Sequence, residues 1–458
     1  MKTATSDIVI LGGGSGGYAC ALRAAELGLR VTLIEQAELG GTCLHRGCIP
    51  TKALLHSAEI ADAARNSAKF GVRTTLEGID IDAVLQYKNT VVARLYKGLK
   101  GLVQSSSINY VAGRGVLADT GTVVVGTDEY RGSHLVLATG SYPRTLPGLD
   151  IGDRILTSDQ ALSLPRIPRT VIVLGGGVIG VEFASIWRSF GAEVTIIEAL
   201  PRLIAAEDPA SSKALERAFR KRGIKSLTGV PFARASQDAE AVHVTTEDGR
   251  TLDADVLLVA VGRGPRTEGM GFEEAGIAMD RGYVLTDPRL ATTAAGVFAV
   301  GDIVPGLQLA HRGFAQGIFV AEEIGGCNPR TIDEDAIPRV TYSEPEVASV
   351  GLNEAVAAQR HGADQIVTYE YNLAGNGKSQ ILGTAGFVKL IQVKDGPIVG
   401  VHMVGARVGE LVSEAQLIVG WQADPDDVAP LIHAHPTQGE ALGEAHLALA
   451  GKPLHAHS

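Results

Sequence analysis

Two cysteines, Cys43 and Cys48, lie five positions apart in a run that also contains Gly40, Gly41 and Gly47. A reducing compartment disfavours structural disulfides, so a close pair of thiols there indicates half of a metal site or a redox couple. A zinc site would need two further ligands at suitable spacing, and none follows the pair nearby. We therefore predict a redox couple at these cysteines and no bound metal.

The five-residue spacing also predicts the local backbone. In a regular α-helix such residues have Cα atoms roughly 8–9 Å apart, whereas a disulfide tolerates at most about 7 Å. The bridge therefore needs a distorted turn, for which Gly47 supplies conformational freedom, and Pro50 suits the first turn of the helix that follows. A bridge in such a turn is expected to be readily reduced, and a helix beginning near Cys48 would stabilise its thiolate.

A second candidate for chemistry is His435, followed five residues later by Glu440. A thiol must lose its proton before it attacks a disulfide, and histidine is suited to take that proton near neutral pH. A carboxylate such as Glu440 can orient the ring and stabilise the imidazolium. The other interpretation is a histidine-rich, partly solvated terminal segment, and the residues alone leave both open. The further histidines of this segment are His433, His446, His455 and His457.

An internal repeat predicts the elements that position these groups. Residues 8–14 are echoed by residues 171–177, and each copy continues through a helical stretch into a second apolar strand that ends in an acid, Glu35 or Glu198. Each copy is a βαβ unit with parallel strands, and two such units predict two doubly wound nucleotide-binding domains. The turn glycines are Gly12, Gly14 and Gly17 in the first copy and Gly175, Gly177 and Gly180 in the second.

Each copy has the residues of a dinucleotide site. The glycines permit a tight turn and close approach of the backbone to a pyrophosphate, and the helix N-terminus supplies oriented N–H groups with a partial positive charge. The acid accepts hydrogen bonds from a ribose 2′-hydroxyl. Glu198 would repel the 2′-phosphate of NADP, so we expect NAD. Two copies predict two nucleotides, one bound tightly and one exchanging, as in a flavoenzyme that uses a nicotinamide.

The whole chain sets wider limits. Its 458 residues correspond to about three domains at roughly 150 residues each. The net charge of −10 argues against a nucleic-acid partner. No apolar run is long enough to cross a bilayer. The first apolar run, residues 8–11, leads directly into the glycine turn and leaves no room for a signal peptide. We expect a cytoplasmic protein without a membrane partner.

The remaining chain alternates between helical and strand-like patterns. Residues 54–100 have mostly helical spacing, and after about residue 338 the pattern predicts a third, α+β domain. Predicted strands lie at residues 116–125, 134–138, 256–261, 296–300, 340–343, 387–393 and 398–404, and predicted helices of the third domain at 408–420 and 439–450.

Four motifs together resemble one family. The run Gly-Gly-Thr-Cys-Leu-x-x-Gly-Cys-Ile-Pro-Thr-Lys at residues 40–52 resembles the redox-active motif of the class I pyridine nucleotide-disulfide oxidoreductases. Residues 138–140 and 296–302 resemble that family's later flavin-domain signatures, and residues 433–440 resemble its C-terminal catalytic motif. Within the family, the His-Ala-His-Pro-Thr form, Glu198 and residues 309–311 are most similar to the NAD-dependent members that oxidise dihydrolipoamide.

The resemblance implies an α/β fold with two doubly wound dinucleotide-binding domains and a C-terminal α+β dimerisation domain. The implied boundaries are an FAD-binding domain at residues 1–145 and 269–337, an NAD-binding domain at 146–268 and a dimerisation domain at 338–458. The implied assembly is a homodimer that places His435 in the partner subunit's active site. The implied partner is the lipoyl-bearing acyltransferase component of a 2-oxo acid dehydrogenase complex, or the lipoyl protein of glycine cleavage.

The same resemblance assigns roles to single residues. It makes Cys43 the interchange thiol, Cys48 the flavin-side thiol, and His435 with Glu440 the acid–base pair. Lys52 would lie near flavin N5 and pair with Glu182. The residues implied for FAD are Gly12, Gly14, Gly17, Glu35, Gly41, Thr42, Thr139, Gly140, Asp302 beside the ribityl chain and Ala310 beside the isoalloxazine ring. Those implied for NAD are Gly175, Gly177, Gly180, Glu198, Gly262 and Val178, the last as a gate over the nicotinamide.

The sequence departs from the family's commonest pattern at His45, Arg46, Gln316 and residues 262–266, which leaves open which host complex the enzyme serves. Other reductases of the same family are the first alternative. Reductases of glutathione-like disulfides would carry basic residues in place of Glu198. A mercuric reductase would have a further cysteine pair after Cys327, and a soluble transhydrogenase would lack the first pair. A scaffolding subunit that has lost catalysis is a rival of another class, and the intact catalytic groups argue against it.

Overall fold

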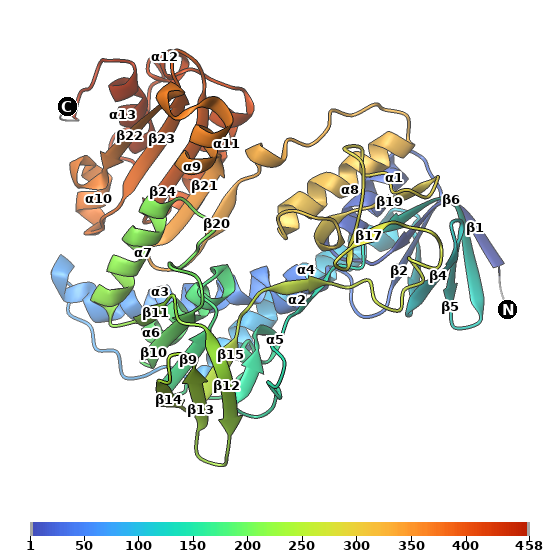
Figure 1. Ribbon diagram of the computed structural model, residues 1–458, viewed down its shortest axis with the longest axis horizontal. Coiled ribbons are helices and arrows are strands. Elements are labelled where there is room, and N and C mark those ends of the chain that lie inside the picture. The colour runs from blue at the N-terminus through green and yellow to red at the C-terminus, as the bar shows by residue number, and fades with distance from the viewer. Residues whose placement is uncertain (1–2, 456–458) are drawn as a thin grey trace.

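The computed structural model describes residues 3–455 and contains three main sheets with helices packed on them (Figure 1). The sheet that contains the N-terminus lies at one end of the molecule in Figure 1, and the C-terminal sheet lies at the other. The mixed α/β class predicted from the sequence is confirmed. No helix in the described part of the chain is long and apolar enough to span a membrane.

The first sheet has the strand order β3-β2-β1-β6-β5-β4, and β19 pairs with β6. Residues 8–11 at its centre are at most 4% exposed because helices α1 and α8 cover one face and an apolar cluster covers the other. β1, β2, β6 and β19 are parallel, so the segments that follow them meet at one edge. The bounds are β1 (Thr3–Leu11), β2 (Val31–Glu35), β3 (Asn109–Ala112), β4 (Gly115–Asp119), β5 (Thr122–Val125), β6 (Asp128–Leu137), β19 (Val297–Ala299), α1 (Ser15–Glu26) and α8 (Ala310–Ile324).

The second sheet repeats this design with five parallel strands in the order β11-β10-β9-β15-β8. Helix α6 covers one face, and a three-stranded antiparallel sheet, β12-β13-β14, packs on the other. The bounds are β8 (Ile155–Thr157), α5 (Ser158–Ala161), β9 (Thr170–Leu174), α6 (Val178–Phe190), β10 (Glu193–Glu198), α7 (Pro209–Arg222), β11 (Lys225–Thr228), β12 (Phe232–Gln237), β13 (Val242–Thr246), β14 (Thr251–Ala254) and β15 (Val256–Val259).

The third sheet is antiparallel, with the order β20-β21-β24-β23-β22. Helices α11 and α13 cover one face through a shared apolar cluster. The bounds are β20 (Arg339–Thr341), β21 (Glu346–Gly351), α9 (Glu354–His361), β22 (Ile366–Asn372), α10 (Gly377–Leu382), β23 (Phe387–Val393), β24 (Ile398–Gly405), α11 (Val408–Gly420), α12 (Pro425–Val428) and α13 (Glu440–Leu449).

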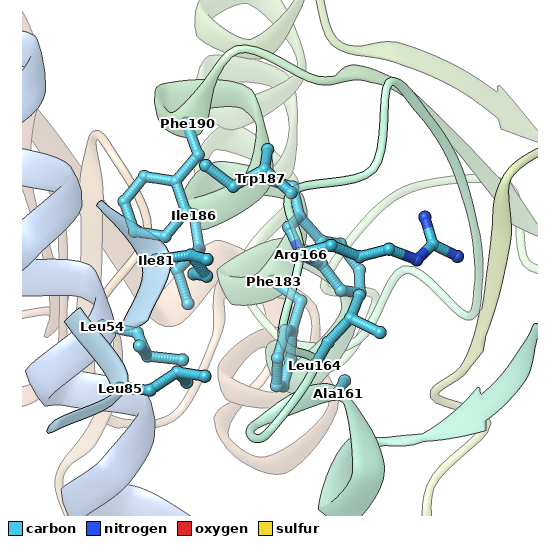
Figure 2. Close-up of a pocket in the computed structure, with 11 residues that line it drawn as sticks. Leu54, Ile81, Leu85, Ala161, Leu164, Arg166, Phe183, Ile186, Trp187 and Phe190 are labelled. Atoms are coloured by element: carbon cyan, nitrogen blue, oxygen red, sulfur yellow. The ribbon is translucent and has the colours of Figure 1, made fainter. Parts of the chain in front are cut away.

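Helices α2 (Gly41–Arg46), α3 (Cys48–Asn66) and α4 (Ile81–Ser105) lie in the chain between β2 and β3 of the first sheet, and α3 packs on α6 of the second unit. Leu54 and Ala58 on α3 share a buried cluster with Phe183 and Trp187 on α6. Figure 2 shows the small apolar cavity at this junction, into which Leu54 of α3 and Phe183 of α6 project. Because its lining is apolar except for Arg166, the cavity is a packing feature rather than a site for the predicted chemistry.

Several predicted elements differ in detail. The strand predicted at residues 116–125 is the hairpin of β4 and β5, and the helical stretch at 54–100 is two helices separated by residues 67–80. The helix α2 that carries Cys43 and the β12-β14 sheet were not predicted. Short strands β7 (Ser141–Pro143) and β16 (Arg263–Pro265) pair with each other, as do β17 (Met279–Asp280) and β18 (Tyr283–Val284). The domain boundaries inferred from the sequence stay a prediction.

Candidate functional site

The two cysteines meet at a break between two helices. Cys43 lies in α2, and Cys48 is the first residue of α3. Between them Gly47 has φ −147° and ψ −112°, and a Cβ at this glycine would lie 3.0 Å from the carbonyl oxygen of Thr42. Glycine therefore allows the chain to turn back closely enough for the Cys43 and Cys48 thiols to form a hydrogen bond. The structure holds both as free thiols, which is the reduced state of the predicted couple.

The surroundings give the two thiols different acidities. The hydrogen bond from Cys43 and the nearby Lys52 ammonium outweigh burial and lower the pKa of Cys48 to about 7. The hydrogen bond to Cys48 and burial raise the pKa of Cys43 well above its ordinary value. Near neutral pH a proton therefore resides on Cys43 while Cys48 is available as a thiolate. Another thiol, Cys20 on α1, is fully buried, and its burial raises its pKa to about 12.

Lys52 lies one helical turn after Cys48 and forms an ion pair with Glu182. Its Nζ donates to both carboxylate oxygens of Glu182, at 2.9 and 2.8 Å. The side chain of Glu182 on α6 is 3% exposed, and its Oε1 also accepts the backbone N–H of Tyr342 at 2.9 Å. Burial lowers the pKa of Lys52, but Glu182 outweighs it and the net pKa is raised. The ammonium therefore stays charged beside Cys48.

The first glycine turn has the geometry of a pyrophosphate cradle. Gly12 has φ +109°, and a Cβ on it would lie 2.2 Å from the carbonyl oxygen of Ala138. A Cβ on Gly17 would lie 1.8 Å from the carbonyl oxygen of Gly12, so helix α1 can pack against the turn only with glycine there. Glu35 Oε2 accepts the N–H of Gly13 at 2.7 Å, which fixes the carboxylate at the end of β2.

The second turn reproduces this geometry. Gly175 also has φ +109°, and a Cβ on Gly180 would lie 1.9 Å from the carbonyl oxygen of Gly175. Glu198 Oε2 accepts the N–H of Gly176 at 2.6 Å, as Glu35 does in the first copy. Gly177 precedes α6, and Val178, the first residue of that helix, is 43% exposed. The two copies therefore present the same acceptor and the same helix N-terminus.

A cavity follows the first turn at the carboxyl edge of the first sheet. Gly14 and Gly41 both line it, and their backbones approach closely, since a Cβ on Gly41 would lie 2.8 Å from the Cα of Gly14. A side chain on Gly41 would force these backbones apart, so glycine keeps the lining compatible with a dinucleotide such as FAD. The residues predicted for FAD that line the cavity are Gly12, Gly14, Glu35, Gly41, Thr42, Thr139 and Gly140.

Asp302 adjoins this cavity through two residues that the sequence did not single out for a role. Ser141 lines the cavity, and its Oγ donates to Asp302 Oδ2 at 2.5 Å. Arg263 Nε donates to the same Ser141 Oγ at 2.7 Å, and burial lowers the pKa of Arg263. The sequence signal for Arg263 is that residues 262–266 depart from the family's commonest pattern, and Gly262 before it has φ +106°. Ala310 is the first residue of α8.

Three of the departures from the family pattern, at Gln316, His45 and Arg46, have ordinary structural partners. The Oε1 of Gln316 accepts the N–H of Gly301 at 2.7 Å, so the amide supplies the acceptor that a carboxylate would. His45 Nε2 forms a hydrogen bond with the carbonyl oxygen of Leu39 at 2.8 Å. The Nε of Arg46 lies 3.9 Å from Oδ2 of Asp159, and Arg46 lines the cavity of the first sheet. None of the three removes a group needed by the cysteine pair.

The predicted acid–base pair is formed, but it lies away from the cysteines of its own chain. His435 Nδ1 lies 2.7 Å from Glu440 Oε1, and Thr437 N donates to Glu440 Oε2 at 2.7 Å. Burial raises the pKa of Glu440, but these two contacts together hold it below its ordinary value. The His435 side chain is 75% exposed, and α13 and α2 lie in separate parts of the molecule (Figure 1). One chain therefore carries both halves of the chemistry without joining them.

The other C-terminal histidines have partners of their own. His433 Nε2 lies 2.7 Å from Glu414 Oε1, and His446 is fully buried. His455, expected in a solvated tail, is 65% exposed but its Nδ1 lies 2.8 Å from Glu444 Oε1. His457 lies outside the described residues.

Comparison with known proteins gives a consistent result. Residues 6–317 match the family model "Pyridine nucleotide-disulphide oxidoreductase", and residues 337–446 match that family's dimerisation domain. The chain is 39% identical to a dihydrolipoyl dehydrogenase of Bacillus subtilis, covering 98% of this chain and 99% of the relative. It is 38% identical to the mitochondrial dihydrolipoyl dehydrogenase 2 of Arabidopsis thaliana, covering 98% and 91%.

Two solved structures support the same assignment. LpdA from Mycobacterium tuberculosis has a TM-score of 0.90 and 27% identity, covering 98% of this chain and all of that one. The HOCl-induced flavoprotein disulfide reductase RclA from Escherichia coli, solved as a Cu(II) complex, has a TM-score of 0.88 and 28% identity, covering 97% and 100%. The chain therefore belongs to the pyridine nucleotide-disulphide oxidoreductases, as an FAD- and NAD-dependent enzyme of that family.

Proposed function

We propose that this protein is a dihydrolipoyl dehydrogenase, which oxidises protein-bound dihydrolipoamide and reduces NAD. The observation that carries the proposal is the pairing of Cys43 and Cys48 at the break between α2 and α3, with the Lys52–Glu182 ion pair one helical turn after Cys48. The identity of 36–39% to curated dihydrolipoyl dehydrogenases over nearly the whole chain supports the substrate class. Glu198 supports NAD, because its carboxylate would repel the 2′-phosphate of NADP.

The catalytic groups divide the thiol chemistry between them. His435, held by Glu440, takes the proton of one substrate thiol, and the resulting thiolate attacks Sγ of Cys43 in the oxidised pair. The Cys43–Cys48 bond breaks, and Cys48 leaves as a thiolate that the Lys52 ammonium stabilises. The second substrate thiol then attacks the mixed disulfide, so the substrate leaves as a cyclic disulfide and Cys43 leaves as a thiol.

The nucleotide sites connect this exchange to NAD. The first glycine turn, Glu35 and Asp302 would hold FAD, and the second turn with Glu198 would hold NAD. When bound, FAD supplies the two-electron transfer between the Cys48 thiolate and NAD. Lys52 keeps a positive charge where negative charge develops during that transfer, and Glu182 keeps the ammonium in place.

The remaining expectations belong to the same proposal. The protein would work as a homodimer, supported by the match to a dimerisation domain, with each His435 serving the partner subunit's cysteine pair. Its macromolecular partner would be a lipoyl-bearing acyltransferase of a 2-oxo acid dehydrogenase complex, or the lipoyl protein of glycine cleavage. We place it in the cytoplasm and divide it at the domain boundaries given by the sequence.

Turnover with a panel of substrates tests the proposed activity. Purified protein is expected to reduce NAD with dihydrolipoamide, and to show far lower kcat/KM with NADP or, in reverse, with glutathione disulfide. Cys48→Ser should abolish turnover while FAD stays bound, whereas Cys327→Ser, which alters an exposed cysteine remote in sequence from the pair, should leave turnover unchanged. Preference for another disulfide would identify a different reductase of the family, and a protein without FAD would support a scaffolding role.

A further inference from the structure

One aromatic residue contacts both members of the Lys52–Glu182 pair. Tyr342 follows β20, so it comes from the third sheet, whereas Lys52 is on α3 and Glu182 is on α6. The Lys52 Nζ lies 4.8 Å from the centroid of the Tyr342 ring. The backbone N–H of Tyr342 donates to Glu182 Oε1 at 2.9 Å. The ring thus contacts the cation, and the main chain binds its counter-ion.

The segment that carries Tyr342 is fixed on α6 and α7. Two residues further on, the N–H of Glu344 donates to Ser185 Oγ at 3.0 Å, one turn after Glu182 on α6. Arg222 at the end of α7 donates to the same Ser185 Oγ at 2.7 Å and to the carbonyl oxygen of Glu344 at 3.0 Å. These contacts fix the main chain independently of the ring, so a substitution of the Tyr342 side chain leaves the segment anchored.

Packing also holds the ring itself. Tyr342 Cε1 lies 3.4 Å from the place that a Cβ on Gly409 would take, and Glu346 Oε2 lies 3.1 Å from the same place. The N–H of Gly409 donates to Glu346 Oε2 at 2.8 Å, which fixes the neighbour of the ring. The first turn of α11 therefore packs against the ring.

We infer that Tyr342 is a positioning residue, whose ring holds the Lys52 ammonium against Glu182 and so keeps its charge directed at the Cys48 thiolate. This inference rests on the proposed function in one respect, because that function gives the Cys48 thiolate its role in electron transfer. Two N–H groups of the ammonium are used by Glu182, and the ring shields one face of the cation from water without taking an N–H. Charged and titratable groups around the Lys52 ammonium are Glu182, Cys48, Cys43 and Tyr342, and Glu346 and Glu410 also face the ring.

The test compares variants at position 342 in the FAD-loaded protein. In the two-electron-reduced state, a thiolate in contact with flavin gives a long-wavelength charge-transfer absorbance, and its dependence on pH gives the midpoint at which Cys48 loses its proton. Tyr342→Phe keeps the ring and should leave the midpoint unchanged. Tyr342→Leu removes the ring, and the midpoint should rise by about 0.5–1 pH unit because the ammonium stabilises the thiolate less. Tyr342→Trp provides a stronger π face, and its midpoint should equal that of the wild type or lie below it.

Each outcome decides the inference. The inference would be overturned if the Leu variant, with FAD bound, kept the wild-type midpoint. It would also be overturned if the midpoint of the Phe variant shifted as far as that of the Leu variant. If Tyr342→Leu loses FAD, Tyr342→Met is the second ring-free variant and is judged in the same way. The reduced state is produced with NADH or dithionite, so dihydrolipoamide is not needed. Failure of the proposed substrate would therefore appear in turnover and leave this result intact.

Discussion

Cys43 and Cys48 have the same side chain, but their surroundings give them different proton affinities. Cys48 receives a hydrogen bond from Cys43 and faces the Lys52 ammonium, and its pKa falls to about 7 from an ordinary value of 9.0. Cys43 keeps its proton because that hydrogen bond and burial raise its pKa. The sequence took the assignment of Cys48 as the flavin-side thiol from family order, and this assignment stays a prediction that the acidity of Cys48 supports.

The acidity of Cys48 predicts a pH dependence. Since a thiol is charged after it loses its proton, the thiolate–flavin absorbance of the reduced protein should grow as pH rises through about 7 and disappear below it. Lys52→Met removes the stabilising charge, so its midpoint should lie higher than that of the wild type. A spectroscopic pH titration measures both. A wild-type midpoint near 9 would mean that the surroundings do not act on Cys48 as described.

Glu35 and Glu198 form matched hydrogen bonds in the two glycine turns, so each serves as a control for the other. Glu198→Gln weakens an acceptor for the ribose hydroxyl, and we expect the KM for NAD to rise about tenfold, the effect of a hydrogen bond to a charged group. The KM for NADP should fall because the repulsion of its 2′-phosphate is reduced. Glu35→Gln should weaken FAD retention and leave the KM for NAD unchanged. Steady-state kinetics with both nucleotides would reject the assignment if the two variants behaved alike.

Among the elements, the break between α2 and α3 determines whether the cysteines meet. Gly47→Ala would place a Cβ 3.0 Å from the Thr42 carbonyl oxygen and 3.4 Å from the Cys43 Cα. We expect the free energy of unfolding to fall by about 1–3 kcal/mol, as in other overpacked sites, and the reduced pair to reoxidise more slowly. Denaturant unfolding and thiol titration measure these effects.

Gly98 provides the matched control for that substitution. It lies in the exposed middle of α4, and a Cβ there would have no neighbour within 4 Å. Gly98→Ala should therefore stabilise the protein by up to about 1 kcal/mol through its higher helix propensity. Equal effects of the two substitutions would show that the close approach at Gly47 has no role in the cysteine geometry.

The sequence predicted the elements whose causes act within a few neighbouring residues, and it missed contacts between distant parts of the chain. The glycine turns, the helix from Cys48 and the distorted turn at Gly47 were predicted because turn and spacing rules act within a few residues. Helix α2 was missed because its six residues have no amphipathic period. The Ser141–Arg263 contact with Asp302 joins residues more than 100 positions apart, and no local pattern signals it. The contact of Tyr342 with Lys52 was missed for the same reason.

At the scale of the whole molecule, the predicted base lies apart from the predicted redox pair. Helix α13, which begins at Glu440, lies beside the third sheet, whereas α2, which carries Cys43, lies between the first two sheets (Figure 1). A homodimer would complete each site with the His435–Glu440 pair of the partner subunit. Dimerisation would then be a requirement of catalysis as well as of stability.

Mixed dimers test this arrangement. Cys43→Ser and His435→Gln homodimers should each be inactive or reduced about 10²–10⁴-fold. If the histidine acts across the interface, a dimer with one subunit of each kind has one site with both mutations and one intact site. Subunit exchange should therefore restore activity to about half the wild-type value per mixed dimer. No recovery, with exchange verified by differently tagged subunits, would show that the histidine acts within its own chain or not at all.

The central claim is that electrons pass from a dithiol to flavin through the Cys43–Cys48 pair. Anaerobic titration of the oxidised, FAD-loaded protein with dihydrolipoamide tests it most directly. One equivalent is expected to produce the long-wavelength thiolate–flavin absorbance in the wild type, and no such absorbance in Cys48→Ser, with FAD still bound in both. Flavin reduction by dihydrolipoamide at the wild-type rate in Cys48→Ser would contradict the claim.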